Sequence, residues 1–191
     1  MKKLTAIALA MVLMLTLFAG CGKEEPAATE APVAMPDSAL EILETVWASY
    51  SDEEKFPVVG GNIEAGIMDA PGNYDMTYAE NMTYNLLVPA DKIGNVSEAA
   101  SMIHMMNANT FTCGVFKLNS ISAADFGAAM KDAVLNNQWM CGFPETLTVA
   151  VIGGEYVLIA FGVNDAMNPF MTHFGEAFAD ANILFNEAVA G

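Results

Sequence analysis

The sequence contains no arginine: its seven basic residues are all lysines, against 23 Asp and Glu residues, and the formal net charge is −16 at pH 7. Proteins that bind nucleic acids neutralise phosphate charge with Lys and Arg, and Arg is the side chain best suited to bidentate phosphate binding. The composition therefore argues against nucleic acid as a partner. It equally disfavours electrostatic docking on anionic lipids.

The sequence also lacks an apolar run long enough to cross a bilayer as a helix. Its N-terminal apolar run, residues 4–19, is shorter than the roughly 20 residues that a spanning helix needs. The run follows Met1-Lys2-Lys3 and leads into the small residues Ala19-Gly20. A cationic start, an apolar run and small residues are typical of a secretory signal peptide. We therefore expect residues 1–20 to be one.

The residues LFAGC, at positions 17–21, resemble the lipobox of bacterial lipoproteins, in which a lipid is attached to the cysteine sulfur and the chain is cut just before it. Leu17 lies one position further out than in the commonest pattern. Two acyl chains hold a protein to a membrane durably. We expect lipid attachment at Cys21 and an exported protein on the outer face of the bacterial cytoplasmic membrane. Ordinary secretion with a free Cys21 thiol, or an uncleaved anchor, are the alternatives.

The rest of the chain divides by composition. Residues 22–36 are rich in Ala, Pro and Glu and contain no aromatic residue. With the lipidated cysteine they predict a disordered tether over residues 21–36. Residues 37–191 have the length and apolar content of a single globular domain.

A pattern of hairpin followed by helix occurs twice in this domain, at about 99–137 and at about 146–187. In each unit two apolar runs flank a turn, which is Asn107-Ala108-Asn109 in the first and Gly153-Gly154 in the second. Two such units predict an α+β fold in two layers, with a four-stranded antiparallel sheet and helices on one face.

An additional N-terminal helix is predicted where Ser38 and Glu41 have the spacing of a capping box. Apolar residues follow at helical intervals, and we expect the helix to end near Ser51.

Three further segments have weaker signals of secondary structure. Residues 55–75 contain several Gly and Pro and predict a loop with a short strand. Residues 76–88 fit a helix. Residues 164–189 predict a final helix with Asn168 and Pro169 at its start.

Once Cys21 is lipidated, two cysteines remain, Cys113 in a predicted strand and Cys141 in a predicted loop. Outside the cytoplasm such a pair can form a disulfide, and two buried free thiols are the alternative. Their spacing is not that of a C-x-x-C redox motif. The pair nevertheless suggests an alternative function, an envelope thiol–disulfide accessory protein.

The sequence shows no catalytic, metal-binding or phosphate-binding motif. His104 and His173 do not have the spacing of metal ligands, and the acidic run Asp52-Glu53-Glu54 is typical of a solvated surface. A hydrolase that used the dispersed acids would need two carboxylates facing one cleft. We therefore expect no enzymatic activity, no metal and no cofactor. Our leading hypothesis is a binding module for an envelope protein or a small ligand.

The segment 136–147 places several aromatic and apolar residues in the connection between a predicted helix and a predicted strand. Such connections either cap a core or form a contact surface. We expect Trp139, Phe143 and Pro144 to form a contact surface.

The segment from about Ala99 to Phe161 resembles a bacterial, Firmicutes-type lipoprotein family with a domain of unknown function. The resemblance is carried by MIHMMNANTFTCGVFKL (102–118), by the helix leading to NNQWMCGFPE (136–145) and by TLTVAVIGGEYVLIAFG (146–162). It covers about a third of the chain, together with the lipobox arrangement. It implies an exported α+β domain and offers no functional residues to transfer.

Overall fold

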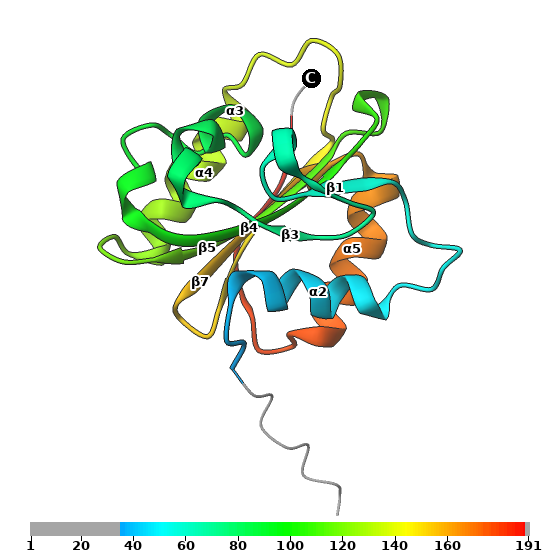
Figure 1. Cartoon of the computed structure of the whole chain (residues 1–191), viewed down its shortest axis with the longest axis horizontal. Coiled ribbons are helices and arrows are strands. Elements are labelled where there is room, and N and C mark those ends of the chain that lie inside the picture. Colours follow the sequence, from blue (N-terminus) through cyan, green and yellow to red (C-terminus); the bar gives the residue numbers. More distant parts are fainter. Residues whose placement is uncertain (1–34, 190–191) are drawn as a thin grey trace, which may run out of the picture. The chain divides into compact units, whose positions relative to one another are not determined.

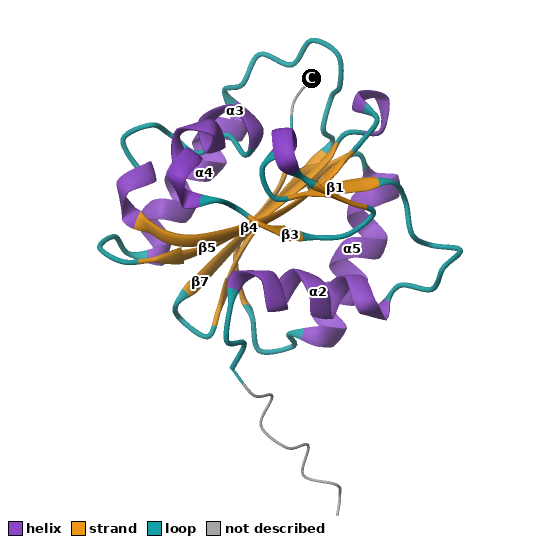
Figure 2. Ribbon diagram, in the orientation of Figure 1, coloured by secondary structure: helices purple, strands orange, loops and turns teal. Residues whose placement is uncertain are grey.

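The structure is a computed structural model that describes residues 35–189. Within this range four α-helices and an eight-stranded sheet form an α+β domain, and all strand pairings are antiparallel (Figure 1, Figure 2). The predicted signal peptide, the lipidation site Cys21 and most of the predicted tether lie outside the described residues.

The elements follow one another along the chain as helices, strands and short 3-10 helices. The α-helices are α2 (Ala39–Ser49), α3 (Met82–Asn85), α4 (Ala123–Leu135) and α5 (Asn164–Ala177). The strands are β1 (Val58–Gly60), β2 (Ile67–Met68), β3 (Gly72–Asn73), β4 (Val96–His104), β5 (Phe111–Leu118), β6 (Thr146–Ile152), β7 (Tyr156–Gly162) and β8 (Asn182–Ala188). The 3-10 helices are η1 (Ile63–Ala65), η2 (Met76–Asn81), η3 (Ile93–Asn95) and η4 (Asn107–Asn109).

Both predicted hairpins are confirmed and form the centre of the sheet, whose strand order is β2-β1-β4-β5-β7-β6-β8, with β3 also paired to β4. The hairpin β4–β5 turns through η4, and the hairpin β6–β7 turns at Gly153-Gly154. These two glycines have φ values of 58° and 79°, which glycine adopts without the steric cost that other residues meet. Pairing of β5 with β7 then joins the two hairpins into one sheet.

The prediction of a four-stranded sheet is wrong, because four more strands extend it. Residues 55–75 supply the short strands β1, β2 and β3 instead of one. At the other edge, residues 182–188 form β8 where a continuing helix was predicted. Here the chain pairs with the otherwise open edge of β6, which satisfies backbone groups that an edge strand leaves unpaired.

The prediction of helices on one face is also wrong, because the sheet is covered on both faces. Figure 1 shows α2 and α5 on one side of the sheet and α3 and α4 on the other. Side chains alternate along a strand, so Leu158 packs in the core under α2 and α5, whereas Val157 and Ile159 pack in the second core. All seven residues of β7 are buried, as expected for a strand sandwiched between two helical layers.

The N-terminal helix begins where the capping signal predicts. The Ser38 hydroxyl accepts the backbone N–H of Glu41 at 3.1 Å, and the Glu41 carboxylate accepts the N–H of Asp37 at 2.6 Å. The helix ends at Ser49, two residues earlier than expected. The predicted helix at 76–88 is instead η2 followed by α3, because Tyr78 has non-helical backbone angles.

The last helix, α5, begins at Asn164 rather than at Asn168, so Pro169 lies inside it.

Candidate functional site

The predicted contact segment is 136–147, of which residues 136–145 connect α4 to β6. Its three predicted contact residues differ in exposure. Phe143 is 54% exposed, Trp139 is half-buried and Pro144 is buried. The Trp139 ring packs against Phe161 of β7 with ring centroids 5.6 Å apart. Pro144 therefore belongs to the interior, while Phe143 and part of Trp139 are available to a partner.

A pocket of about 190 Å³ lies between this segment and the β4–β5 connection. Its wall includes Met106, Trp139, Met140 and Cys141. Met106 is 55% exposed and Met140 is 84% exposed. Methionine side chains are flexible and polarizable, so they adapt to the shape of a partner. We name the exposed group Met106, Met140 and Phe143, together with this pocket, the apolar patch.

Trp139 carries an unused hydrogen-bond donor in the wall of the same pocket. Its indole Nε1 is buried and has no acceptor among the described residues. A buried donor without a partner costs about 1–3 kcal/mol.

His104 also lines this pocket, but its chemistry is fixed by its neighbours. Its ring stacks on Phe56, with centroids 5.2 Å apart, and its Nδ1 accepts the backbone N–H of Met106 at 2.9 Å. Burial lowers the pKa of His104. The neutral ring therefore carries its proton on Nε2, which leaves neither nitrogen free to bind a metal ion.

The two cysteines of the domain are free thiols in different surroundings. Cys113 is buried in β5 and faces α2 and α5, whereas Cys141 is exposed at the apolar patch. Burial raises the pKa of Cys113 well above its ordinary value. Because the thiolate is the reactive form, this arrangement gives no support to disulfide exchange between the two residues. The disulfide considered from the sequence is not formed.

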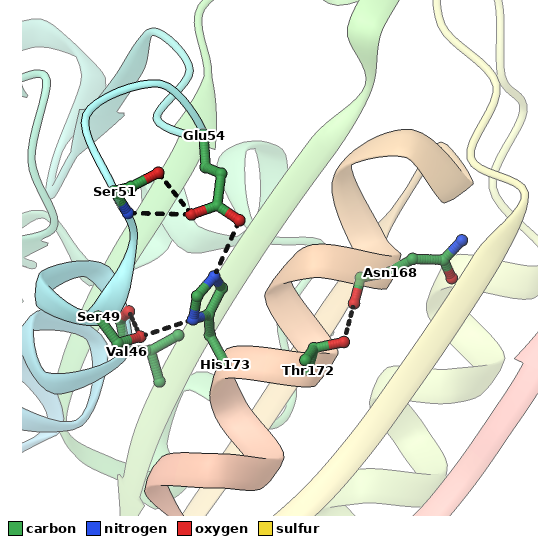
Figure 3. Close-up of polar contacts among 7 residues, drawn as sticks. All are labelled: Val46, Ser49, Ser51, Glu54, Asn168, Thr172 and His173. Atoms are coloured by element: carbon green, nitrogen blue, oxygen red, sulfur yellow. Dashed lines mark hydrogen bonds and ion pairs between the residues drawn. The ribbon is translucent and has the colours of Figure 1, made fainter.

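A second polar cluster joins Ser49, His173 and Glu54 (Figure 3). The hydroxyl of Ser49 lies 2.9 Å from Nδ1 of His173, and Oε1 of Glu54 lies 3.8 Å from Nε2. Ser49 ends α2, Glu54 follows it in the next turn, and His173 comes from α5. These are the residue types of a Ser–His–acid triad, so the proton positions decide whether the cluster can act as one.

The Ser49 hydroxyl donates its single proton to the carbonyl oxygen of Val46 at 2.7 Å, within its own helix. It therefore accepts a hydrogen bond from Nδ1–H of His173. A nucleophilic serine does the opposite, because it gives its proton to the histidine. The cluster thus ties the end of α2 to α5 and is not arranged for nucleophilic catalysis.

Glu54 is held in place by Ser51. One carboxylate oxygen accepts both the backbone N–H and the hydroxyl of Ser51, at 3.0 Å and 2.7 Å. These hydrogen bonds, and then the neighbouring His173, lower the pKa of Glu54. Sequence reasoning missed this cluster because Ser49 and His173 are 124 residues apart and share no local motif.

Over residues 35–189 no three His, Cys, Asp or Glu residues come together as ligands of a metal ion. In the same range, no helix is both long enough and apolar enough to span a membrane.

Comparison with known proteins gives no relative. The sequence matches no protein-family model, and no curated protein and no solved structure matches it significantly. The resemblance of residues 99–161 to a lipoprotein family therefore stays a prediction.

Proposed function

We propose that this chain is an exported bacterial lipoprotein, anchored through Cys21, whose domain is a non-enzymatic binding module. The anchor rests on the order of charge, apolar run and LFAGC in the first 21 residues. The family resemblance of residues 99–161 agrees with this reading.

The observation that supports a binding role is the apolar patch. Met106 and Met140 line the pocket and are each more than half exposed, and Phe143, which is 54% exposed, directly follows the pocket residue Gly142 in the chain. Clustered exposed apolar side chains beside a hollow are characteristic of interaction surfaces. The partner we propose is an envelope protein that inserts an apolar side chain into the pocket. Because the chain is strongly acidic, complementary positive charge around that side chain would favour and orient the encounter.

The proposed absence of enzymatic activity is supported by the surroundings of two residues of reactive type, Ser49 and Cys113. The Ser49 hydroxyl donates its proton to the carbonyl oxygen of Val46 and not to His173. The pKa of Cys113 is raised by burial, which keeps this residue in its thiol form.

The anchor is tested by expressing the full chain and its Cys21→Ser variant in a Gram-positive bacterium. We expect mass spectrometry of the membrane fraction to show an N-terminal cysteine carrying a diacylglyceryl group, and the variant to lose it. Unmodified Cys21 in protein released into the medium would contradict the proposal.

The contact surface is tested by photocrosslinking in living cells. A benzophenone amino acid is placed at Phe143 and, as a control, at Ile183, which is exposed on β8. We expect one discrete crosslinked protein from position 143 that disappears with Met140→Glu. Equal products from both positions, or a product insensitive to Met140→Glu, would contradict the contact surface and leave the anchor unaffected.

A further inference from the structure

A second pocket, separate from the apolar patch, lies in the segment between β1 and α3. Its volume is about 350 Å³, within the range of sites for small molecules. It is formed by η1, by η2 and by the residue that precedes each of them, and its wall consists of Asn62, Glu64, Ala65, Asp75, Tyr78 and Asn81. It shares no residue with the pocket of the apolar patch.

The key residue of this pocket is Asn62, which is only 8% exposed. Its Oδ1 accepts the backbone N–H of Asp75 at 2.5 Å. Its Nδ2 is buried and has no hydrogen-bond partner among the described residues. Rotating the amide would remove the acceptor of the Asp75 N–H, so the orientation is fixed. Because this donor is covered, a hydrogen-bond acceptor in a bound ligand would satisfy it after a covering side chain moves aside.

The charge of the pocket restricts the ligand. Glu64 and Asp75 contribute carboxylates, and neither forms an ion pair within the described part of the chain. Burial raises the pKa of the adjacent Tyr74, and the carboxylates of Glu64 and Glu80 add to that rise. An anionic ligand would therefore be repelled here.

A cationic ligand fits the carboxylates but not Asn62, because the free Nδ2 presents a positive N–H to it. A hydroxyl group fits both, since it accepts from an amide N–H and donates to a carboxylate. Tyr78 is 54% exposed at the pocket and offers a ring face on which the C–H groups of a sugar can stack.

We propose that the pocket formed by Asn62, Glu64, Asp75, Tyr78 and Asn81 binds an uncharged saccharide. Hydroxyls of the sugar accept from Nδ2 of Asn62 and donate to Glu64 and Asp75, while Tyr78 covers one face of the ring. This is a binding site and not a glycosidase site. A general acid needs a raised pKa, whereas the N–H of Thr77, 2.9 Å from Asp75, lowers the pKa of Asp75.

The test uses the full chain purified in a detergent without sugar groups. Glucose, galactose, N-acetylglucosamine, maltose and cellobiose are screened by saturation-transfer difference NMR, and affinities are measured by calorimetry. We expect saturable binding of at least one of these sugars, with a dissociation constant on the order of 1 mM for a ligand of this size, and no release of monosaccharide from the disaccharides.

Two variants locate the site. Asn62→Asp keeps the oxygen that accepts the Asp75 N–H and removes the N–H donor, and Tyr78→Ala removes the ring. Each should weaken binding by about fivefold or more, as the loss of one hydrogen bond or ring contact implies. Tyr84→Ala is the control, because Tyr84 is an exposed tyrosine that does not line this pocket and should leave binding unchanged.

The proposal is overturned if none of the five sugars binds, or if Tyr78→Ala binds as the unchanged protein does. It is overturned equally if spermidine occupies the pocket and the sugars do not, since the ligand class would then be cationic. Tyr78 is exposed, so its variant stays informative even if Asn62→Asp fails to fold. None of these outcomes bears on the lipid anchor or on the apolar patch.

Discussion

The imidazole of His173 stacks on the phenol ring of Tyr50, with ring centroids 4.1 Å apart and an interplanar angle of 30°. The contact joins α5 to the residue that follows α2. The Tyr50 hydroxyl is buried and has no hydrogen-bond partner among the described residues, and burial raises the pKa of Tyr50. The two rings therefore hold the helices together mainly by apolar contact.

The first prediction concerns this stack. His173→Ala should lower the free energy of unfolding by about 1–3 kcal/mol, because it removes a largely buried ring. His173→Phe keeps a ring on Tyr50 and should recover much of that loss, although it gives up the hydrogen bond to Ser49. Urea denaturation measures both. If the two variants lost equal stability, the Ser49 bond rather than the stack would hold the helices.

The second prediction concerns pH and follows from the lowered pKa of His104. The unfolded chain protonates this histidine near its ordinary value of 6.5, whereas the folded protein resists protonation to lower pH. The stability that the neutral His104 ring contributes is therefore complete above pH 6.5. It is lost as the pH falls from 6.5 through the pKa of His104 in the folded protein. An NMR titration of the ring protons should give a midpoint below 6.5.

His104→Asn provides the matched comparison for this titration. The asparagine oxygen can still accept the Met106 N–H but does not titrate. Stability of this variant should fall less on mild acidification than that of the unchanged protein. A His104 midpoint above 6.5 would show that the ring is stabilised in its charged form.

The third prediction compares two glycines. A Cβ on Gly60 would lie 2.1 Å from the backbone nitrogen of Gly72, so Gly60→Ala must push apart the segments that carry β1 and β3. We expect a loss of about 1–3 kcal/mol or more. Gly94→Ala meets no atom within 4 Å and should stay within about 0.5 kcal/mol of the unchanged protein. Similar thermal unfolding of the two variants would contradict the close backbone approach.

The fourth prediction concerns thiol reactivity. The exposed Cys141 should react with Ellman's reagent in the native protein, and Cys113 only after unfolding, because it is buried and its pKa is raised. Cys141→Ser should remove the native reaction. Rapid native reaction of Cys113, or a disulfide between the two cysteines, would instead favour the thiol–disulfide hypothesis.

Local signals predicted much of the centre of the fold. The capping residues Ser38 and Glu41 placed the start of α2, and Gly153-Gly154 placed the turn of the β6–β7 hairpin. Strands of two or three residues, such as β2 and β3, are too short to show a period. The segment that forms β8 could be read as helix or strand, and its pairing with β6 decides between them.

The burial of the sheet on both faces also has a signal in the sequence. Residues 156–162 are almost uninterruptedly apolar, which indicates a strand covered on both faces rather than on one. The candidate sites also differ in how far the sequence alone can predict them. The segment 136–145 is local and could be found from the sequence, whereas the pocket around Asn62 and the cluster of Ser49 with His173 exist only through contacts between distant segments.

The described chain enters the domain beside the β6–β7 turn, where the side chain of Met35 lies against Gly153. Phe143 precedes the opposite end of β6, a strand of seven residues that is about 23 Å long. The proposed anchor and the proposed contact surface thus lie toward opposite ends of β6, which we call the first and the second pole of the domain. A lipid on Cys21 would tether the domain to the membrane from the side of the first pole. The bilayer would then not need to cover the second pole, and a partner from the surrounding envelope could approach the second pole without obstruction.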